Sequence, residues 1–149
     1  MIASVLIVCT GNICRSPAGE RSIAMLCPGL KVTSAGLGAL VGKPADPVTE
    51  AAAKQHFALD LSGHVARQFS KEIGLANDLI LAMEPHHRDD IQRGWPQLSG
   101  RVMLFSQWSD VNGIEDPYQR PFEVHARVLT HIIRAAETWA GRLQPRITR

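Results

Sequence analysis

The strongest constraint on the fold lies near the N-terminus, where an apolar segment runs directly into a short cysteine-containing loop. Residues 2–8 are apolar and rich in β-branched side chains, which predicts a strand buried on both faces. Ser16 followed by Pro17 indicates a helix start, with Ser16 as the N-cap. Because a loop between a strand and a helix N-terminus exposes backbone amides, residues 9–15 are predicted to form a concave anion site.

The rest of the chain alternates between short apolar segments and helical patterns. Further strands are predicted at residues 30–34, 78–83 and 102–105. After a first helix that ends before Pro28, helices are predicted at residues 48–57, 70–76 and 85–94. A final helix is predicted to carry the apolar positions from Phe122 to Leu143 and to end before Pro145. Because strands that alternate with helices pair in parallel, the pattern predicts an α/β fold with an open parallel sheet covered by helices on both faces.

Length and composition predict a single domain, residues 1–149, and exclude several classes of partner. The formal net charge of +2 is too balanced to indicate a nucleic-acid or membrane partner. No apolar segment approaches about 18 residues and no charged leader is present, so we expect a cytoplasmic protein without membrane insertion. The basic segment 142–149 is interpreted as a solvated helix end.

The cysteines and histidines do not form the patterns of a disulfide framework or a metal-binding motif. Three cysteines in a chain of this size predict free thiols rather than a disulfide framework. The six histidines lack spacings such as H-E-x-x-H, so no metal site is predicted. We therefore expect the chemistry to come from the side chains themselves, with no cofactor.

The first loop carries the pattern C-x5-R-[ST], in which Cys9, Arg15 and Ser16 are the defined positions. A cysteine among amides at a helix N-terminus is stabilised as the thiolate, which is a nucleophile. The guanidinium of Arg15 can bind two oxygens of a tetrahedral dianion at once. Gly11 permits a tight turn toward the anion, and Asn12 tolerates left-handed dihedrals. The combination predicts a phosphate-binding loop with a nucleophile at its base.

A second segment is predicted to reach the same edge of the sheet. Ligands of open α/β sheets bind at the carboxyl ends of the strands, where residues 106–120 leave the fourth strand. This segment contains the acidic residues Asp110, Glu115 and Asp116. Asp116 precedes Pro117, which favours an extended and exposed conformation. Asp116 is therefore the candidate acid facing the loop.

Each of these residues alone has a structural interpretation. Cys9 alone would be a small buried apolar residue, Cys14 a structural thiol, and Asp116-Pro117 an ordinary turn. Arg15 alone would be a solvated residue at a helix start. The functional hypothesis depends on the combination.

The sequence resembles the low-molecular-weight protein tyrosine phosphatases over nearly its whole length. The resemblance is carried by the phosphate loop Cys9-Thr10-Gly11-Asn12-Ile13-Cys14-Arg15-Ser16 and by the segment Asp116-Pro117-Tyr118. It implies a four-stranded parallel sheet flanked by helices, a catalytic role for Cys9, Arg15 and Asp116, and hydrolysis through a cysteinyl-phosphate.

The resemblance also implies supporting roles for other residues. It implies that Asn12 is held by Ser34 and His64, and that Ser16 donates to the thiolate. From the residues alone, His64 would be a half-buried loop residue. The residues predicted to bind the substrate are Thr10, Gly11, Asn12, Ile13, Cys14, Ser16, Leu40 and Tyr118. For Tyr118, packing on the substrate ring and anchoring of its own loop remain alternatives.

Similar family members carry a cysteine at the position of Cys14 and are reversibly oxidised. The resemblance therefore implies a Cys9–Cys14 disulfide that switches the enzyme off. The alternative is that Cys14 only fills space under the loop.

The segment SAGLGALVGK, residues 34–43, resembles the bacterial branch of the family linked to capsule and exopolysaccharide synthesis. In that branch the partner is an autophosphorylating tyrosine kinase. Leu40 then stands where eukaryotic members tend to have an aromatic side chain. The resemblance implies that the protein acts on a phosphotyrosine protein, in particular a bacterial tyrosine autokinase. We expect a monomer.

Two other functions remain to be separated from this one. Thiol-dependent arsenate reductases share the cysteine loop but need further cysteines downstream, and this chain has none after Cys27. A non-catalytic phosphate-binding module would be expected to lack the nucleophile or the acid. An assay of arsenate reduction beside aryl phosphate hydrolysis distinguishes the three.

Overall fold

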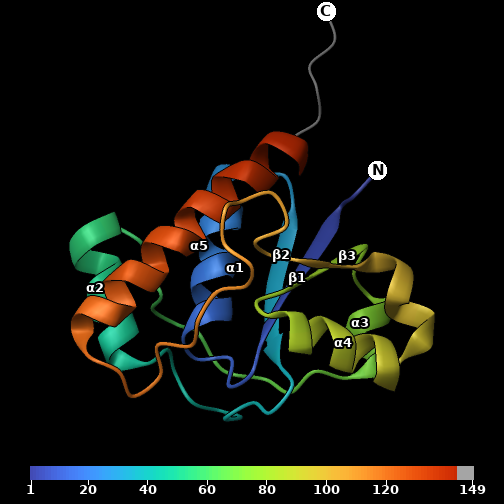
Figure 1. Cartoon of the computed structure of the whole chain (residues 1–149), viewed down its shortest axis with the longest axis horizontal. Helices are drawn as coiled ribbons and strands as arrows, with labels where there is room; N and C mark the ends of the chain where they lie inside the picture. The colour runs from blue at the N-terminus through green and yellow to red at the C-terminus, as the bar shows by residue number, and fades with distance from the viewer. Residues whose placement is uncertain (144–149) are drawn as a thin grey trace, which may run out of the picture.

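A parallel sheet of four strands separates two layers of helices (Figure 1). The computed structural model describes residues 1–143. The strands are β1 (Ser4–Cys9), β2 (Lys31–Gly36), β3 (Leu79–Ala82) and β4 (Val102–Leu104), in the order β2-β1-β3-β4. The helices are α1 (Arg15–Leu26), α2 (Pro47–Phe57), α3 (Lys71–Leu75), α4 (Pro85–Gly94) and α5 (Phe122–Leu143). The predicted fold class is confirmed.

Successive side chains of β1 face opposite helical layers. Val5 and Ile7 pack in the core cluster formed with α1, α2 and α5. Leu6 and Val8 pack in a second cluster with side chains of α4 and the segment before α3. All four side chains are fully buried, as the apolar pattern without polar alternation predicts. β1 is therefore a rigid base for the loop that follows it.

The observed elements differ from the predicted ones mainly at their ends. The first strand begins at Ser4 rather than residue 2 and continues through Cys9. The pattern does not predict the short 3-10 helix η1 (Pro96–Arg101). Of the basic segment 142–149, only residues 142 and 143 are described, and they end α5. The prediction for the remainder lies outside the described residues.

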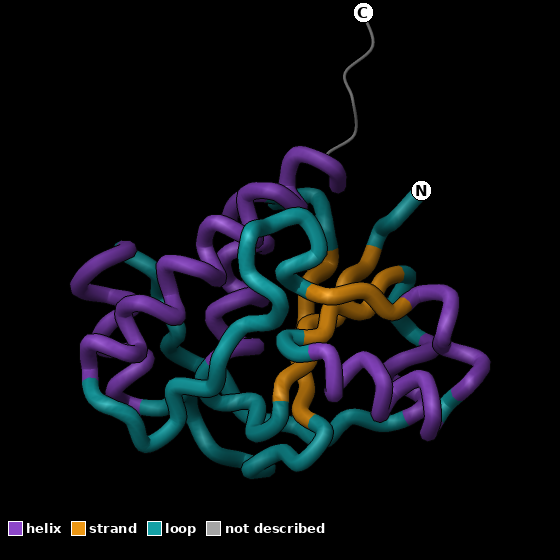
Figure 2. Tube along the Cα trace, viewed as in Figure 1, coloured by secondary structure: helices purple, strands orange, loops and turns teal. Residues whose placement is uncertain are grey.

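All strands end at one edge of the sheet, so the segments that follow them meet there (Figure 2). These segments are the loop after β1, residues 37–46 after β2, Glu84 after β3 and residues 105–121 after β4.

No helix within residues 1–143 is both long and apolar enough to cross a bilayer. The same residues contain no group of three His, Cys, Asp or Glu side chains placed to hold a metal.

Candidate active site

The loop between β1 and α1 turns its carbonyl groups outward. The carbonyls of residues 9–13 all accept hydrogen bonds from donors outside the loop. These donors are the backbone amides of Leu37, Gly38, Leu40 and Asp46 and the Nε2 atom of His64, at distances of 2.6 to 3.0 Å. The amides of residues 10–14 donate to no other group of residues 1–143. The loop is therefore a ring of free donors suited to an anion.

Asn12 supplies the left-handed turn that closes this ring, with a φ of 59°. Gly11 has no positive φ, and a Cβ there would lie 3.7 Å from the Ile13 side chain. The turn predicted at Gly11 therefore depends on Asn12. Glycine is required instead at Gly36 of β2, where a Cβ would lie 2.3 Å from the carbonyl oxygen of Thr10.

The side chain of Ser16 bonds to the nucleophile rather than capping its helix. Its Oγ lies 2.9 Å from Cys9 Sγ and 2.7 Å from Asn12 Nδ2. α1 begins at Arg15, and its N-cap is Cys14 without a side-chain bond. The predicted N-cap role of Ser16 is wrong because its hydroxyl is engaged inside the loop.

A chain of hydrogen bonds with a defined direction ends at the Cys9 thiol. The Glu20 carboxylate can only accept, so Ser34 Oγ donates to it at 2.7 Å and accepts from Asn12 Nδ2 at 3.0 Å. Asn12 gives its other amide hydrogen to Ser16. The Ser16 hydroxyl hydrogen is then left for Cys9. This order of donors stabilises a thiolate at the base of the loop.

Two residues that orient this chain carry no signal in the sequence. Glu20 lies on α1 among other polar residues, and Arg67 is distant from the loop along the chain. Arg67 donates its backbone amide to Asn12 Oδ1 at 2.9 Å and its Nε to the Ser34 carbonyl at 2.9 Å. His64 reaches Asn12 as the resemblance implies, but through the backbone carbonyl. These contacts determine which way the Asn12 amide faces.

Arg15 is oriented by groups from two other loops. Its side chain is 2% exposed, and Nη1 forms an ion pair with Glu84 and donates to the Ile114 carbonyl at 2.7 Å. Nη2 lies 3.7 Å from Asp116 Oδ2. Sequence reasoning did not identify Glu84, since a lone acidic residue before a helix is common. The guanidinium is thereby held beside the loop with its second nitrogen facing the acid.

The segment after β4 brings Asp116, and not its neighbour, to the site. Ile114 is fully buried and anchors the segment. Asp116 is 48% exposed, and its Oδ1 accepts from the Tyr118 amide at 3.1 Å. Glu115 instead pairs with Arg127 of α5 at 2.7 Å. The alternation of side chains along the segment explains this separation of the two carboxylates.

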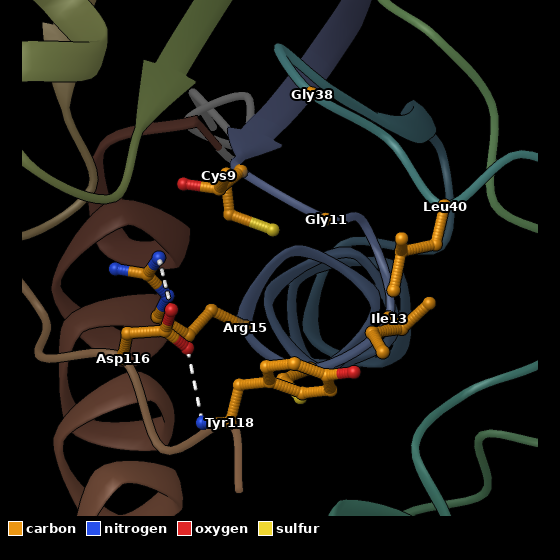
Figure 3. A pocket seen from close by; sticks show the side chains of 10 residues that line it. Cys9, Gly11, Ile13, Arg15, Gly38, Leu40, Asp116 and Tyr118 are labelled. Carbon is orange, nitrogen blue, oxygen red and sulfur yellow. Dashed lines mark hydrogen bonds and ion pairs between the residues drawn. The ribbon is translucent and has the colours of Figure 1, made fainter.

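The pocket over Cys9 has a charged side and an apolar side (Figure 3). It is lined by Cys9, Thr10, Gly11, Ile13, Cys14, Arg15, Gly38, Leu40, Asp116 and Tyr118. Arg15 and Asp116 lie together on one side, whereas Ile13, Leu40 and the ring of Tyr118 border the other. Asn12 and Ser16, which were predicted to bind the substrate, are fully buried and lie beneath the loop instead of lining the pocket.

Cys14 differs from Cys9 in its surroundings. Burial raises the pKa of the Cys14 thiol to about 12, while a hydrogen bond with Thr49 opposes the shift and the charge of Asp46 adds to it. Thr49 in turn lies 2.8 Å from Nδ1 of the buried His125. None of the three cysteines forms a disulfide in this structure. The Cys14 thiol is therefore protonated at physiological pH.

Comparison with known proteins gives three informative relatives. Low molecular weight protein-tyrosine-phosphatase Wzb of Escherichia coli K12 is 47% identical over 143 residues, which cover 96% of this chain and 97% of Wzb. The structure of Vibrio vulnificus Wzb in complex with benzylphosphonate matches with a TM-score of 0.92 and 38% identity, over 96% of this chain and 100% of that one. YwlE arginine phosphatase from Geobacillus stearothermophilus matches with a TM-score of 0.86 and 29% identity, over 94% and 92%.

The family model described as low molecular weight phosphotyrosine protein phosphatase matches residues 4–148. The family, the fold and the enzyme class predicted from the sequence are confirmed by this match and by the relatives. The chain belongs to the low molecular weight phosphotyrosine protein phosphatase family.

Proposed function

We propose that this chain hydrolyses phosphotyrosine in proteins through a cysteinyl-phosphate on Cys9. The observation that carries the proposal is the loop of residues 9–13, whose carbonyls are all held outward while the amides around the Cys9 thiol stay free. Such a loop binds a phosphate dianion, and Arg15 adds a guanidinium that can grip two oxygens. Membership of the family supports the same activity.

In the first step, the Cys9 thiolate attacks phosphorus as the bond to the phenolic oxygen breaks on the opposite side. Ser16 stabilises the thiolate before the attack, since its hydroxyl lies 2.9 Å away. Arg15 and the loop amides hold the three equatorial oxygens while charge is redistributed. Asp116 enters this step protonated and gives its proton to the leaving oxygen, so that a neutral phenol departs.

In the second step, Asp116 acts as a carboxylate and takes a proton from the attacking water. The phosphorus–sulfur bond breaks, Cys9 leaves as a thiolate, and inorganic phosphate is released. Asp116 is suited to both steps because it is 48% exposed and therefore reaches both the pocket and solvent. The two steps need no cofactor.

The apolar side of the pocket favours a phenyl ring over a guanidinium. Ile13 and Leu40 offer no acceptor to a charged nitrogen, and Tyr118 offers a ring face and one hydroxyl. A phosphotyrosine ring would bury apolar area here, whereas a phosphoarginine would lose hydration without gaining a carboxylate other than Asp116. We therefore assign the pocket to phosphotyrosine.

The proposed physiological substrate is an autophosphorylated bacterial tyrosine kinase of capsule or exopolysaccharide synthesis. Similarity to Wzb supports this choice. The phosphatase would act as a monomer in the cytoplasm, where the kinase domain presents its phosphotyrosines. The same active site would carry the Cys9–Cys14 redox pair.

The decisive experiment compares three substrates at equal concentration with the purified full chain. A phosphotyrosine peptide, the same peptide with phosphoarginine, and arsenate with a thiol reductant are assayed side by side. We expect phosphate release from the first alone. Preferential release from the phosphoarginine peptide, or thiol-dependent reduction of arsenate, would replace the proposed function with the corresponding alternative.

The Cys9→Ser variant is the control for the mechanism. Serine keeps the shape of the loop but does not supply a stabilised anionic nucleophile, so turnover should be abolished while phosphate or vanadate binding remains measurable. Both are measured, by initial rates and by calorimetry. A burst of phenol with a trapped phosphoenzyme in this variant would show that the nucleophile is another residue.

A further inference from the structure

His87 is a buried histidine that the proposed reaction does not use. It lies in the first turn of α4 and is 1% exposed. Its Nδ1 lies 3.1 Å from the backbone nitrogen of Glu84, and its Nε2 lies 2.8 Å from Thr10 Oγ1. One ring therefore contacts both the residue after the nucleophile and the residue that pairs with Arg15.

The two partners determine which nitrogen carries the hydrogen. The Glu84 N–H can only donate, so Nδ1 accepts and carries no hydrogen. The neutral ring then has its hydrogen on Nε2, which donates to Thr10 Oγ1. Burial, and after it the positive charge of Arg15, lowers the pKa of His87 to about 4. The ring is therefore neutral at physiological pH, as this arrangement requires.

Because His87 Nε2 donates to Thr10 Oγ1, the hydroxyl hydrogen of Thr10 can be donated to another acceptor. Thr10 is exposed and lines the pocket, and its carbonyl is already bonded to the Gly38 amide at 3.0 Å. Its hydroxyl accepts from His87 and keeps one hydrogen to donate. A phosphate held by the loop amides brings anionic oxygens close to this position.

We propose that His87 is a positioning residue that holds the Thr10 hydroxyl as a donor to the bound phosphate. The proposal rests on the proposed phosphatase site. Thr10 and His87 act as one unit, so that loss of either side chain weakens phosphate binding to the same extent.

Conservative substitutions separate the two contacts of the ring. In His87→Asn, the side-chain oxygen takes the place of Nδ1 and keeps the bond to Glu84, but the donor to Thr10 is lost. In His87→Gln, the longer side chain places its amide near Nε2 and keeps a donor for Thr10. Thr10→Val removes the hydroxyl and preserves the shape. His131→Asn, on α5, is the matched control.

The readout is the dissociation constant of inorganic phosphate, measured by calorimetry, together with kcat and KM for an aryl phosphate. We expect His87→Asn and Thr10→Val each to weaken phosphate binding by about ten- to a hundredfold, the worth of one hydrogen bond to a charged group. The double variant should be no weaker than either, and His87→Gln and His131→Asn should bind as the wild type does. Multiplied losses in the double variant, or unchanged binding in Thr10→Val, would overturn the proposal.

A spectroscopic measurement tests the hydrogen bond from His87 to Thr10 even if a His87 variant does not fold. Long-range proton–nitrogen spectra identify which ring nitrogen carries the hydrogen. We expect it on Nε2 in the wild type, with an Nε2 resonance that shifts in Thr10→Val. A hydrogen on Nδ1, or an unchanged resonance, contradicts the proposal. Failure of the proposed phosphatase function would look different, because phosphate binding and these spectra would persist without phosphotyrosine turnover.

Discussion

At the scale of single residues, Asn12 controls the shape of the anion site. Its left-handed backbone turns the loop, and its side-chain amide passes the hydrogen-bond direction from Ser34 to Ser16. Left-handed backbone at an asparagine is predictable from the residue type. Its amide also accepts from Arg67, 55 positions away, and a partner at that distance depends on which loops meet in the fold. For the same reason Glu84 and Glu20 could not be recognised from the sequence.

The role of Asp116 can be tested by varying the leaving group. Asp116→Asn should lower kcat/KM, which reports the steps up to departure of the phenol, by roughly 10²–10⁴-fold for phenols of high pKa, the range typical of general acid catalysis. The loss should shrink for good leaving groups, which depart without a proton. The measurement is kcat/KM across a series of aryl phosphates. A uniform loss across the series would instead mean that Asp116 only positions its segment, and Glu115 or Asp110 would become the candidate acid.

At the scale of elements, helices α2 to α4, which have a local start signal, begin within one residue of the prediction. α4 begins at Pro85, and α3 follows Ser70, whose Oγ accepts from the Ile73 amide at 3.2 Å. α1 is the exception because the hydroxyl of Ser16, its expected cap, bonds to Cys9 and Asn12 instead. A local rule therefore fails where the active site recruits the same atom. This kind of failure is itself a sign of function.

The loop between β1 and α1 leads to a redox prediction. Cys9 and Cys14 both line the pocket. Peroxide should oxidise the Cys9 thiolate to a sulfenic acid, and the Cys14 thiol should then condense with it, releasing water and forming a disulfide. The test is peroxide inactivation followed by dithiothreitol. The wild type should recover most of its activity, because the disulfide is reducible.

The Cys14→Ser variant completes this test. Without the second thiol, the sulfenic acid of Cys9 is open to irreversible oxidation, so activity should not return. Cys27→Ser is the matched control, since this buried cysteine is not among the residues that line the pocket. Equal recovery in wild type and Cys14→Ser would show that Cys14 has no protective role and only fills space.

At the scale of the whole molecule, the parallel pairing of the strands is predictable from the sequence, whereas their order in the sheet is not. Alternating strands and helices require crossovers, and crossovers require parallel pairing. The order β2-β1-β3-β4 depends on the side to which each crossover turns, which the apolar pattern does not reveal. The contact between the loop after β1 and the segment after β4 could be predicted from the parallel pairing alone, because both segments follow the carboxyl ends of strands.

Global stability should depend on pH through His87. Its pKa of about 4 in the folded state lies below the ordinary 6.5, so the unfolded chain binds the extra proton. The stability from neutral His87 is therefore complete above pH 6.5 and is lost as the pH falls toward 4. The groups facing the ring are Arg15, His86, Glu84 and Asp90.

Urea unfolding of wild type and His87→Gln at several pH values measures this effect. The free energy of unfolding should fall more steeply in the wild type between neutral pH and pH 4, by at most about 3 kcal/mol. The other titrating groups are common to both proteins and cancel in the difference. Parallel curves would mean that His87 takes up its proton equally well in the folded state.

The positions of the Arg15 partners in the sequence determine the order in which the parts of the active site are synthesised. Its partners Glu84 and Ile114 lie 69 and 99 positions later in the chain, and α5, which packs on α1, is the last element of residues 1–143. During synthesis the ribosome releases the nucleophile first, but its guanidinium has no anchor until most of the polypeptide has emerged. A nascent or truncated chain therefore holds a thiol without a working phosphate clamp, and the ability to remove phosphate arrives only with the finished molecule.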